Sequence, residues 1–292
     1  MIQLIKLDKI FDELLIKGNW MEFKEKQYDG NYEVSEVEFY NENQIINGLL
    51  YFPPSHYQKP YSLIIYFHGF PQLSSLGEIA KNYHFLLDMG YAFLVMSFRG
   101  YNFTPGEISI SSQTSDGLKI LKLTRLMVKK GIFKKNDINI LANDFGAYIA
   151  LFLASRVKFL NKMLLLNSII NLEKHVNHID FSKSLHYINR FLPGYVKGIQ
   201  DVDKFIEMTK NELEQKHYKI KDIIKGVSIE KIRIISGSDD RITPIYEVNE
   251  FVRNPLKHVE HVIIKKMAHE PYKEEEYNEI EEMIKTFFYV LG

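Results

Sequence analysis

The sequence contains no cysteine, and this absence excludes disulfide bonds and thiolate metal sites. It has no excess of either charge, because 37 Lys and Arg residues balance 37 Asp and Glu residues, so a basic nucleic-acid-binding face is not expected. No apolar run is long enough to span a bilayer, and the N-terminal residues carry too many charges for a signal peptide. These absences predict a cytoplasmic protein with neither a nucleic acid nor a membrane as a partner.

The 292 residues are 46% hydrophobic and 25% charged, which is typical of a soluble globular protein. A hairpin pattern over residues 34–40 and 45–52 comes first. Short buried apolar runs then alternate with helical patterns, and these runs lie at residues 62–67, 91–98, 138–142, 162–167, 232–236 and 259–265. This alternation predicts an α/β protein with a mostly parallel twisted sheet and helices on both faces.

The alternation pauses over residues 170–228, where two helical patterns replace it. We therefore expect a helical lid insertion at 170–228, within a core made of residues 31–169 and 229–292. Helical spacing over residues 2–17 predicts an N-terminal helical extension, which we assign to residues 1–30. Four histidines lie in the insertion, but their spacing does not favour a metal site, and we predict neither a metal nor a cofactor.

One turn carries the strongest chemical signal in the sequence. Residues 138–142 form a short apolar run, and Asp144 and Gly146 follow it with the small-x-nucleophile-x-Gly spacing of a nucleophile elbow. In such an elbow a strained strand-to-helix corner presents one side chain at the edge of the sheet. Serine is the usual residue there, and here the position is Asp144. A simpler alternative is that Asp144 only caps the helix that follows.

Two further side chains follow strand ends in an informative order. Asp240 follows the run at 232–236, and His269 follows the last run, which gives the order nucleophile, acid, histidine along the chain. The carboxyl ends of parallel strands meet at one edge of the sheet, so we expect the three side chains of Asp144, Asp240 and His269 to converge. The alternatives are Asp239 as the acid, and a His269 that lies in an ordinary surface loop.

Other residues are predicted to complete the site. The backbone N–H groups of Phe70 and Phe145 follow the first buried run and the candidate nucleophile, so they are candidate oxyanion donors. We also expect four side chains near the substrate: His68, Tyr148, Tyr187 and Tyr195.

The chain resembles α/β-hydrolases from end to end. Residues 34–170 resemble the catalytic domain of prolyl-oligopeptidase-like peptidases and esterases in these motifs: Tyr51-Phe52-Pro53-Pro54, His68-Gly69-Phe70-Pro71, Gly90-Tyr91-Ala92, Arg99-Gly100-Tyr101, Asp116 and Asn136-Asp137-Ile138-Asn139-Ile140. That resemblance implies an acyl hydrolase with a serine nucleophile, and Asp144 departs from it. Asp144-Phe145-Gly146 is also similar to the elbow of epoxide hydrolases and haloalkane dehalogenases, although dehalogenases usually have tryptophan where this chain has Phe145.

Three hypotheses follow for a substrate that is a small molecule or a short peptide. In the first, Asp144 acts as a covalent nucleophile on an epoxide-like substrate or an activated acyl group, and His269 with Asp240 activates water. In the second, an acyl hydrolase has had its serine replaced by aspartate. In the third, the protein keeps the pocket, binds a ligand and has lost the chemistry. The sequence carries no signal for the oligomeric state.

Overall fold

The computed structural model describes residues 21–101, 104–253 and 259–289, with side chains from residue 27 onward. The helix predicted over residues 2–17 lies outside these ranges. The described strands form one nine-stranded sheet in the order β1-β2-β3-β5-β4-β6-β7-β8-β9. In chain order the strands are β1 (Met21–Asp29), β2 (Tyr32–Asn41), β3 (Gln44–Tyr51), β4 (Tyr61–Phe67), β5 (Tyr91–Ser97), β6 (Phe133–Asn143), β7 (Lys162–Leu166), β8 (Lys231–Gly237) and β9 (Val259–Ile264).

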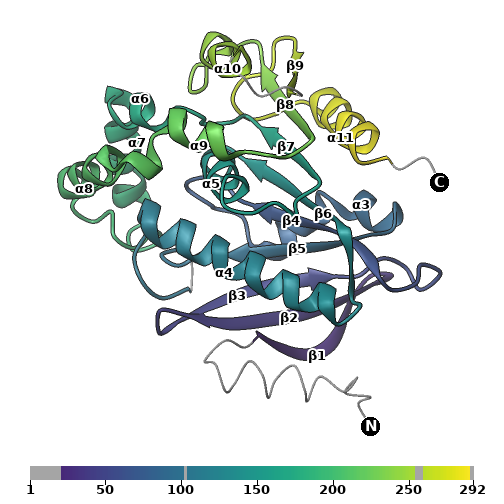
Figure 1. Cartoon of the computed structure of the whole chain (residues 1–292). Helices are drawn as coiled ribbons and strands as arrows, with labels where there is room; N and C mark the ends of the chain where they lie inside the picture. The colour runs from purple at the N-terminus through teal and green to yellow at the C-terminus, as the bar shows by residue number, and fades with distance from the viewer. Residues whose placement is uncertain (1–20, 102–103, 254–258, 290–292) are drawn as a thin grey trace.

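Six of these strands, β4 to β9, pair in parallel, and β1, β2 and β3 add an antiparallel edge (Figure 1). The predicted hairpin and the parallel sheet are confirmed, and all seven residues of β5 are buried. The last predicted run was expected to be buried as well, but β9 lies at the edge of the sheet and only Ile264 in it is buried. Strand β1 was not predicted. The extension assigned to residues 1–30 was expected to be helical, but its last part pairs with β2. An edge strand is covered on few sides, so its sequence does not need the continuous apolar run by which the central strands were recognised.

Helices cover both faces of the sheet (Figure 1). On one face, α4 (Ile110–Lys129), α5 (Phe145–Ala154) and α10 (Ile245–Val252) contribute to a large apolar core. On the other face, α2 (Leu76–Lys81), α3 (His84–Asp88) and α11 (Glu274–Phe288) pack a second core. None of the helices in the described part of the chain is both long and apolar enough to cross a membrane.

The segment between β7 and β8 is helical, as expected. It contains α6 (Leu172–Val176), α7 (Ile179–Phe191), α8 (Val202–Glu214), the 3₁₀ turn η1 (Lys216–Tyr218) and α9 (Ile220–Gly226). We call this segment the insertion. It is anchored to the core, because the Glu212 carboxylate on α8 accepts hydrogen bonds from the backbone N–H groups of Ile110 (2.9 Å) and Ser111 (3.0 Å) at the start of α4.

Candidate active site

The turn between β6 and α5 has the strained backbone of a nucleophile elbow. Asp144 has φ 52° and ψ −122°, a conformation that a residue with a side chain rarely adopts and that costs on the order of 1–3 kcal/mol. The turn is held by hydrogen bonds from Asp144 N–H to the Leu166 carbonyl (2.9 Å) and from Ile169 N–H to the Asp144 carbonyl (3.2 Å). Gly146 is required two residues later, because a Cβ there would lie 2.3 Å from the Phe67 carbonyl oxygen. The predicted elbow is therefore present in the backbone.

The Asp144 carboxylate points away from the helix that it precedes. Its side chain makes no capping hydrogen bond to α5, so the alternative role as a helix cap is wrong. One oxygen, Oδ2, accepts a hydrogen bond from the backbone N–H of Phe70 at 2.7 Å. The other oxygen, Oδ1, lies 3.3 Å from Nε2 of His269. Gly69 allows this approach, because a Cβ at that position would lie 2.7 Å from the Asp144 Cβ.

Asp240 orients His269 from the other side of the imidazole ring. Nδ1 of His269 lies 2.9 Å from Oδ2 of Asp240. Oδ1 of Asp240 accepts from the backbone N–H groups of Ile242 (2.8 Å) and Thr243 (2.9 Å), and the Thr243 hydroxyl donates to Oδ2. The neighbouring Asp239 accepts from the Ser238 hydroxyl at 2.8 Å, so Asp240 and not Asp239 is the acid of this arrangement. The three side chains expected to converge do so.

The pKa values of His269 and Asp240 are shifted in opposite directions. Burial by itself lowers the pKa of His269, but hydrogen bonds to Asp144 and Asp240 outweigh it and raise the pKa to about 10. Burial would raise the pKa of Asp240, and its hydrogen bond to His269 instead holds the pKa below the ordinary value. At neutral pH His269 is therefore an imidazolium between the side chains of Asp144 and Asp240.

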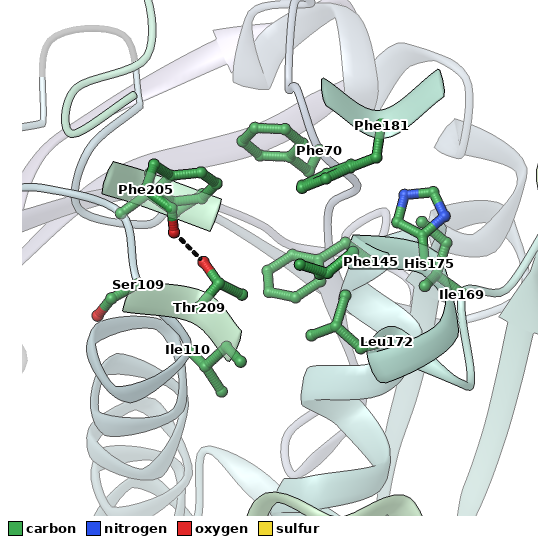
Figure 2. Close-up of a pocket in the computed structure, with 12 residues that line it drawn as sticks. Phe70, Ser109, Ile110, Phe145, Ile169, Leu172, His175, Phe181, Phe205 and Thr209 are labelled. Carbon is green, nitrogen blue, oxygen red and sulfur yellow. Dashed lines mark hydrogen bonds between the residues drawn. The ribbon is translucent and has the colours of Figure 1, made fainter. Parts of the chain in front are cut away.

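An apolar pocket lies next to the elbow, between the core and the insertion (Figure 2). Its lining residues are Phe70, Ile108, Ser109, Ile110, Phe145, Ile169, Leu172, His175, Val176, Phe181, Phe205 and Thr209. Two of these residues, Phe70 and Phe145, also contact or adjoin Asp144: the Phe70 N–H donates to its carboxylate, and Phe145 follows it in the chain. Their backbone N–H groups are the two that were predicted to hold an oxyanion. The N–H of Phe145 is the first in α5, where helical N–H groups have no partner within the helix.

The four side chains predicted near the substrate are not among the residues that line this pocket. His68 is buried, with Nδ1 2.8 Å from the Gly69 carbonyl, and burial lowers its pKa to about 4, so it supports the turn that presents Phe70. Tyr148 and Tyr195 donate their hydroxyl groups to backbone carbonyls, and the Tyr187 side chain is 63% exposed. The choice of Tyr187 and Tyr195 depended on how the insertion packs, whereas Tyr148 lies in α5 of the core.

Sequence reasoning missed the aromatic side chains that the insertion supplies. Phe181 and Phe205 line the pocket, and the Phe70 and Phe205 rings stack at 6.3 Å. The only available signal was their place in helical patterns, which indicates a buried face without saying what the face covers. His175 also lines the pocket and had been considered only as a possible metal ligand. Among the described residues, no group of His, Asp and Glu side chains has an arrangement that could hold a metal ion.

Comparison with known proteins gives information about the fold. No protein-family model matches this sequence, and no curated protein sequence does. Solved structures do match. Acetyl xylan esterase 1 from a Thermoanaerobacterium species is 15% identical, with a TM-score of 0.62 over 98% of both chains. The 2,6-dihydroxy-pseudo-oxynicotine hydrolase is 16% identical, with a TM-score of 0.63 over 87% of this chain and 66% of that chain.

A third similar structure is the acylaminoacyl peptidase of Pyrococcus horikoshii. It is 16% identical, with a TM-score of 0.64 over 98% of this chain and 45% of that chain. At these identities the similarity establishes the α/β-hydrolase fold of this protein, while its reaction has to be argued from its own residues.

Proposed function

We propose that this protein is a hydrolase in which the Asp144 carboxylate attacks an electrophilic saturated carbon of a small apolar molecule, such as an epoxide. His269, oriented by Asp240, then directs water at the resulting ester. The observation that carries the proposal is the different environment of the two Asp144 oxygens. Oδ2 accepts the N–H of Phe70, whereas Oδ1 faces His269. The apolar, aromatic lining of the adjacent pocket supports an apolar substrate.

The two environments fit the two oxygens of a covalent ester. If Oδ1 forms the bond to carbon, Oδ2 becomes the ester carbonyl oxygen, and it already accepts a hydrogen bond from an oxyanion donor. When water adds to this carbonyl, negative charge develops on Oδ2, where the N–H groups of Phe70 and Phe145 can stabilise it. A carboxylate attacking an ester or amide carbonyl would instead form a high-energy anhydride, so the residue at this position favours attack on saturated carbon.

Alkylation also prepares His269 to act as a base. The ester carries no charge, so one of the two carboxylates that raise the pKa of His269 is lost. The ring can then release its proton and accept a new one from the attacking water. When the tetrahedral intermediate collapses, that proton goes to the departing alcohol oxygen. The collapse leaves Asp144 as a carboxylic acid, whose proton passes to the neutral His269. The carboxylate and the imidazolium are thereby regenerated, and the sum of both steps is the addition of one water to the substrate.

The direct test is to trap the ester. A His269→Gln variant keeps a polar side chain but lacks the base, so incubation with styrene oxide should leave an adduct on the peptide that contains Asp144. The matched controls are the His269→Gln/Asp144→Asn variant, which should form no adduct there, and His269→Gln/Asp239→Asn, which should form it normally. An unmodified Asp144 peptide in the His269→Gln variant would overturn the proposal.

A second candidate is acyl hydrolysis by a site whose serine has been replaced. The esterase and peptidase named above, which share the fold, favour it, as do the two oxyanion donors beside the elbow position. On this account Asp144→Ser should gain hydrolysis of p-nitrophenyl acetate relative to the unaltered protein. If Asp144→Ser stays inert and Asp144 forms no adduct, but an apolar ligand still binds in the pocket, a non-catalytic binding protein is the better account.

A further inference from the structure

Opening an epoxide requires a second group besides the nucleophile. In a displacement at carbon, the bond that forms and the bond that breaks lie on opposite sides of the carbon atom. The oxygen that leaves therefore points away from Asp144, and it becomes an alkoxide unless a donor supplies a proton. Asp144 and His269 both reach the site from strand ends of the core, so the donor is expected on the part of the pocket wall that the insertion contributes.

Three side chains in the pocket wall carry polar atoms. Ser109 caps α4, because its Oγ accepts from Ser112 N–H at 2.9 Å, and it also lies 3.0 Å from the Ser111 hydroxyl. The Thr209 hydroxyl donates to the Phe205 carbonyl at 2.7 Å, as Figure 2 shows. His175 differs from both: within the described part of the chain, its ring nitrogens form no hydrogen bond. Of these three groups, His175 is the one whose polar side-chain atoms have no hydrogen-bond partner among the described residues.

The His175 ring is held at the pocket by packing. It belongs to α6, at the start of the insertion, and meets the Phe181 ring in a T-shaped contact at 5.0 Å and 63°. In Figure 2 the imidazole lies on the same side of the pocket as Ile169, with Phe205 and Ser109 on the opposite side. His175 lines the same pocket as Phe70, whose backbone N–H donates to the Asp144 carboxylate.

The protonation state of His175 suits a donor that must not compete with Asp144. Burial lowers the pKa of His175 more than the Asp144 and Asp240 carboxylates raise it, and His269 and His178 lower it further. At neutral pH the ring is neutral and carries one N–H. It therefore does not form an ion pair that would occupy the nucleophile. Neutral imidazole is a known hydrogen-bond donor to developing oxyanions in enzymes.

We infer that His175 is a further catalytic residue, which donates its N–H proton to the oxygen that leaves as Asp144 attacks the carbon of an epoxide. This role rests on the proposed function. The Asp144 Oδ1–C bond forms, the C–O bond breaks, and its electron pair goes to the oxygen, which takes the proton from His175. The donation leaves the His175 ring as an imidazolate, which regains a proton from solvent. The His269 imidazolium gives up one proton to solvent after alkylation. The charges balance, and His269 is left neutral for the second step.

The test compares two leaving groups in the His269→Gln background, in which the adduct on Asp144 accumulates. In styrene oxide the leaving group is an alkoxide oxygen, which needs a proton. In (1-bromoethyl)benzene, which has a similar carbon skeleton, the leaving group is bromide, which needs none. His175→Phe should slow adduct formation from the epoxide by ~100-fold, the scale of general acid catalysis, and leave the rate from the bromide unchanged. His175→Gln, which restores an N–H donor, should recover part of the rate. The control His186→Phe changes an exposed histidine of the insertion and should affect neither reagent.

Each other result has a separate meaning. If His175→Phe slows both reagents equally, the ring only shapes the pocket and the inference is overturned. If it slows neither reagent, the proton comes from elsewhere and the inference is overturned as well. If the parent forms no Asp144 adduct with either reagent, the proposed function itself fails and the role of His175 falls with it. Adduct formation in the His269→Gln variant therefore tests the proposed function, and the effect of His175→Phe on its rate tests the role of His175.

Discussion

Replacing Asp144 by Asn is expected to lower the pKa of His269 toward its ordinary value. The Asn side chain has nearly the same shape, and its carbonyl oxygen can still accept the N–H of Phe70. It removes one of the two negative charges that face the imidazole, which lie at 3.3 Å and 2.9 Å from the ring nitrogens. The His269 side chain is only 14% exposed, so water screens these charges weakly.

The magnitude follows from the raised pKa of His269. A shift from 6.5 to about 10 corresponds to about 5 kcal/mol at ~1.36 kcal/mol per unit. Because the folded protein binds this proton more tightly than the unfolded chain does, the contribution is fully present below pH 6.5 and is lost as the pH rises through about 10. The unaltered protein should thus lose up to about 5 kcal/mol of unfolding free energy from this group across that window. The Asp144→Asn variant should lose less, because only Asp240 still stabilises the imidazolium.

Two measurements check this reasoning. NMR titration of the His269 Cε1–H signal reports the pKa directly, and urea unfolding at several pH values between 6.5 and 10 reports the linked stability. Asp239→Asn is the matched control, because Asp239 is the adjacent carboxylate and accepts from Ser238 instead of His269. A His269 that titrates near 6.5 in the unaltered protein, or whose pKa is the same in Asp144→Asn, would refute the account of the triad.

Two other substitutions test the parts that support the site. Gly69→Ala should slow adduct formation on Asp144 by ~100-fold in the His269→Gln background, because its Cβ would lie 2.8 Å from Oδ2 and displace the carboxylate from an oxyanion donor; a rate equal to that of the parent would contradict this. Asp116→Ala should destabilise the protein by about 3–5 kcal/mol in urea unfolding, because it leaves the buried Arg99 guanidinium without its main partner; no change in the unfolding midpoint would show that the pair is not needed.

The convergence of the candidate site residues was predictable because it depends on strand ends. A buried run of four to eight apolar residues marks a strand, and the residue after it lies at the carboxyl edge of a parallel sheet. Asp144, Asp240 and His269 were placed in this way, and so were the backbone donors of Phe70 and Phe145. None of these assignments required a side-chain packing arrangement to be known, since the order of motifs along the chain was enough.

The pocket was not predictable, because its shape depends on how side chains of the insertion pack. Its walls come from α6, α7 and α8, and the hydrophobic spacing of a helix shows which face is buried but not which neighbour buries it. Tyr187 and Tyr195 belong to the insertion and were expected near the substrate, yet Tyr187 is exposed and Tyr195 donates its hydroxyl to the Leu73 carbonyl. The donor that lines the pocket is His175, a residue with no distinctive sequence context. Strand β1 was missed on similar grounds, because an edge strand lacks a continuous apolar run.

The central claim is that Asp144 forms a covalent ester, and a single turnover in heavy-oxygen water tests it most directly. Excess protein is mixed with limiting styrene oxide in H₂¹⁸O, and the mass of the tryptic peptide of residues 136–156 is measured by mass spectrometry. Since water attacks the carbonyl carbon of the ester, one ¹⁸O should remain in the Asp144 carboxylate, and the first diol released should carry the original oxygen of Asp144. Label found only in the diol, with an unlabelled Asp144 peptide, would show that water attacks the substrate directly and would contradict the account.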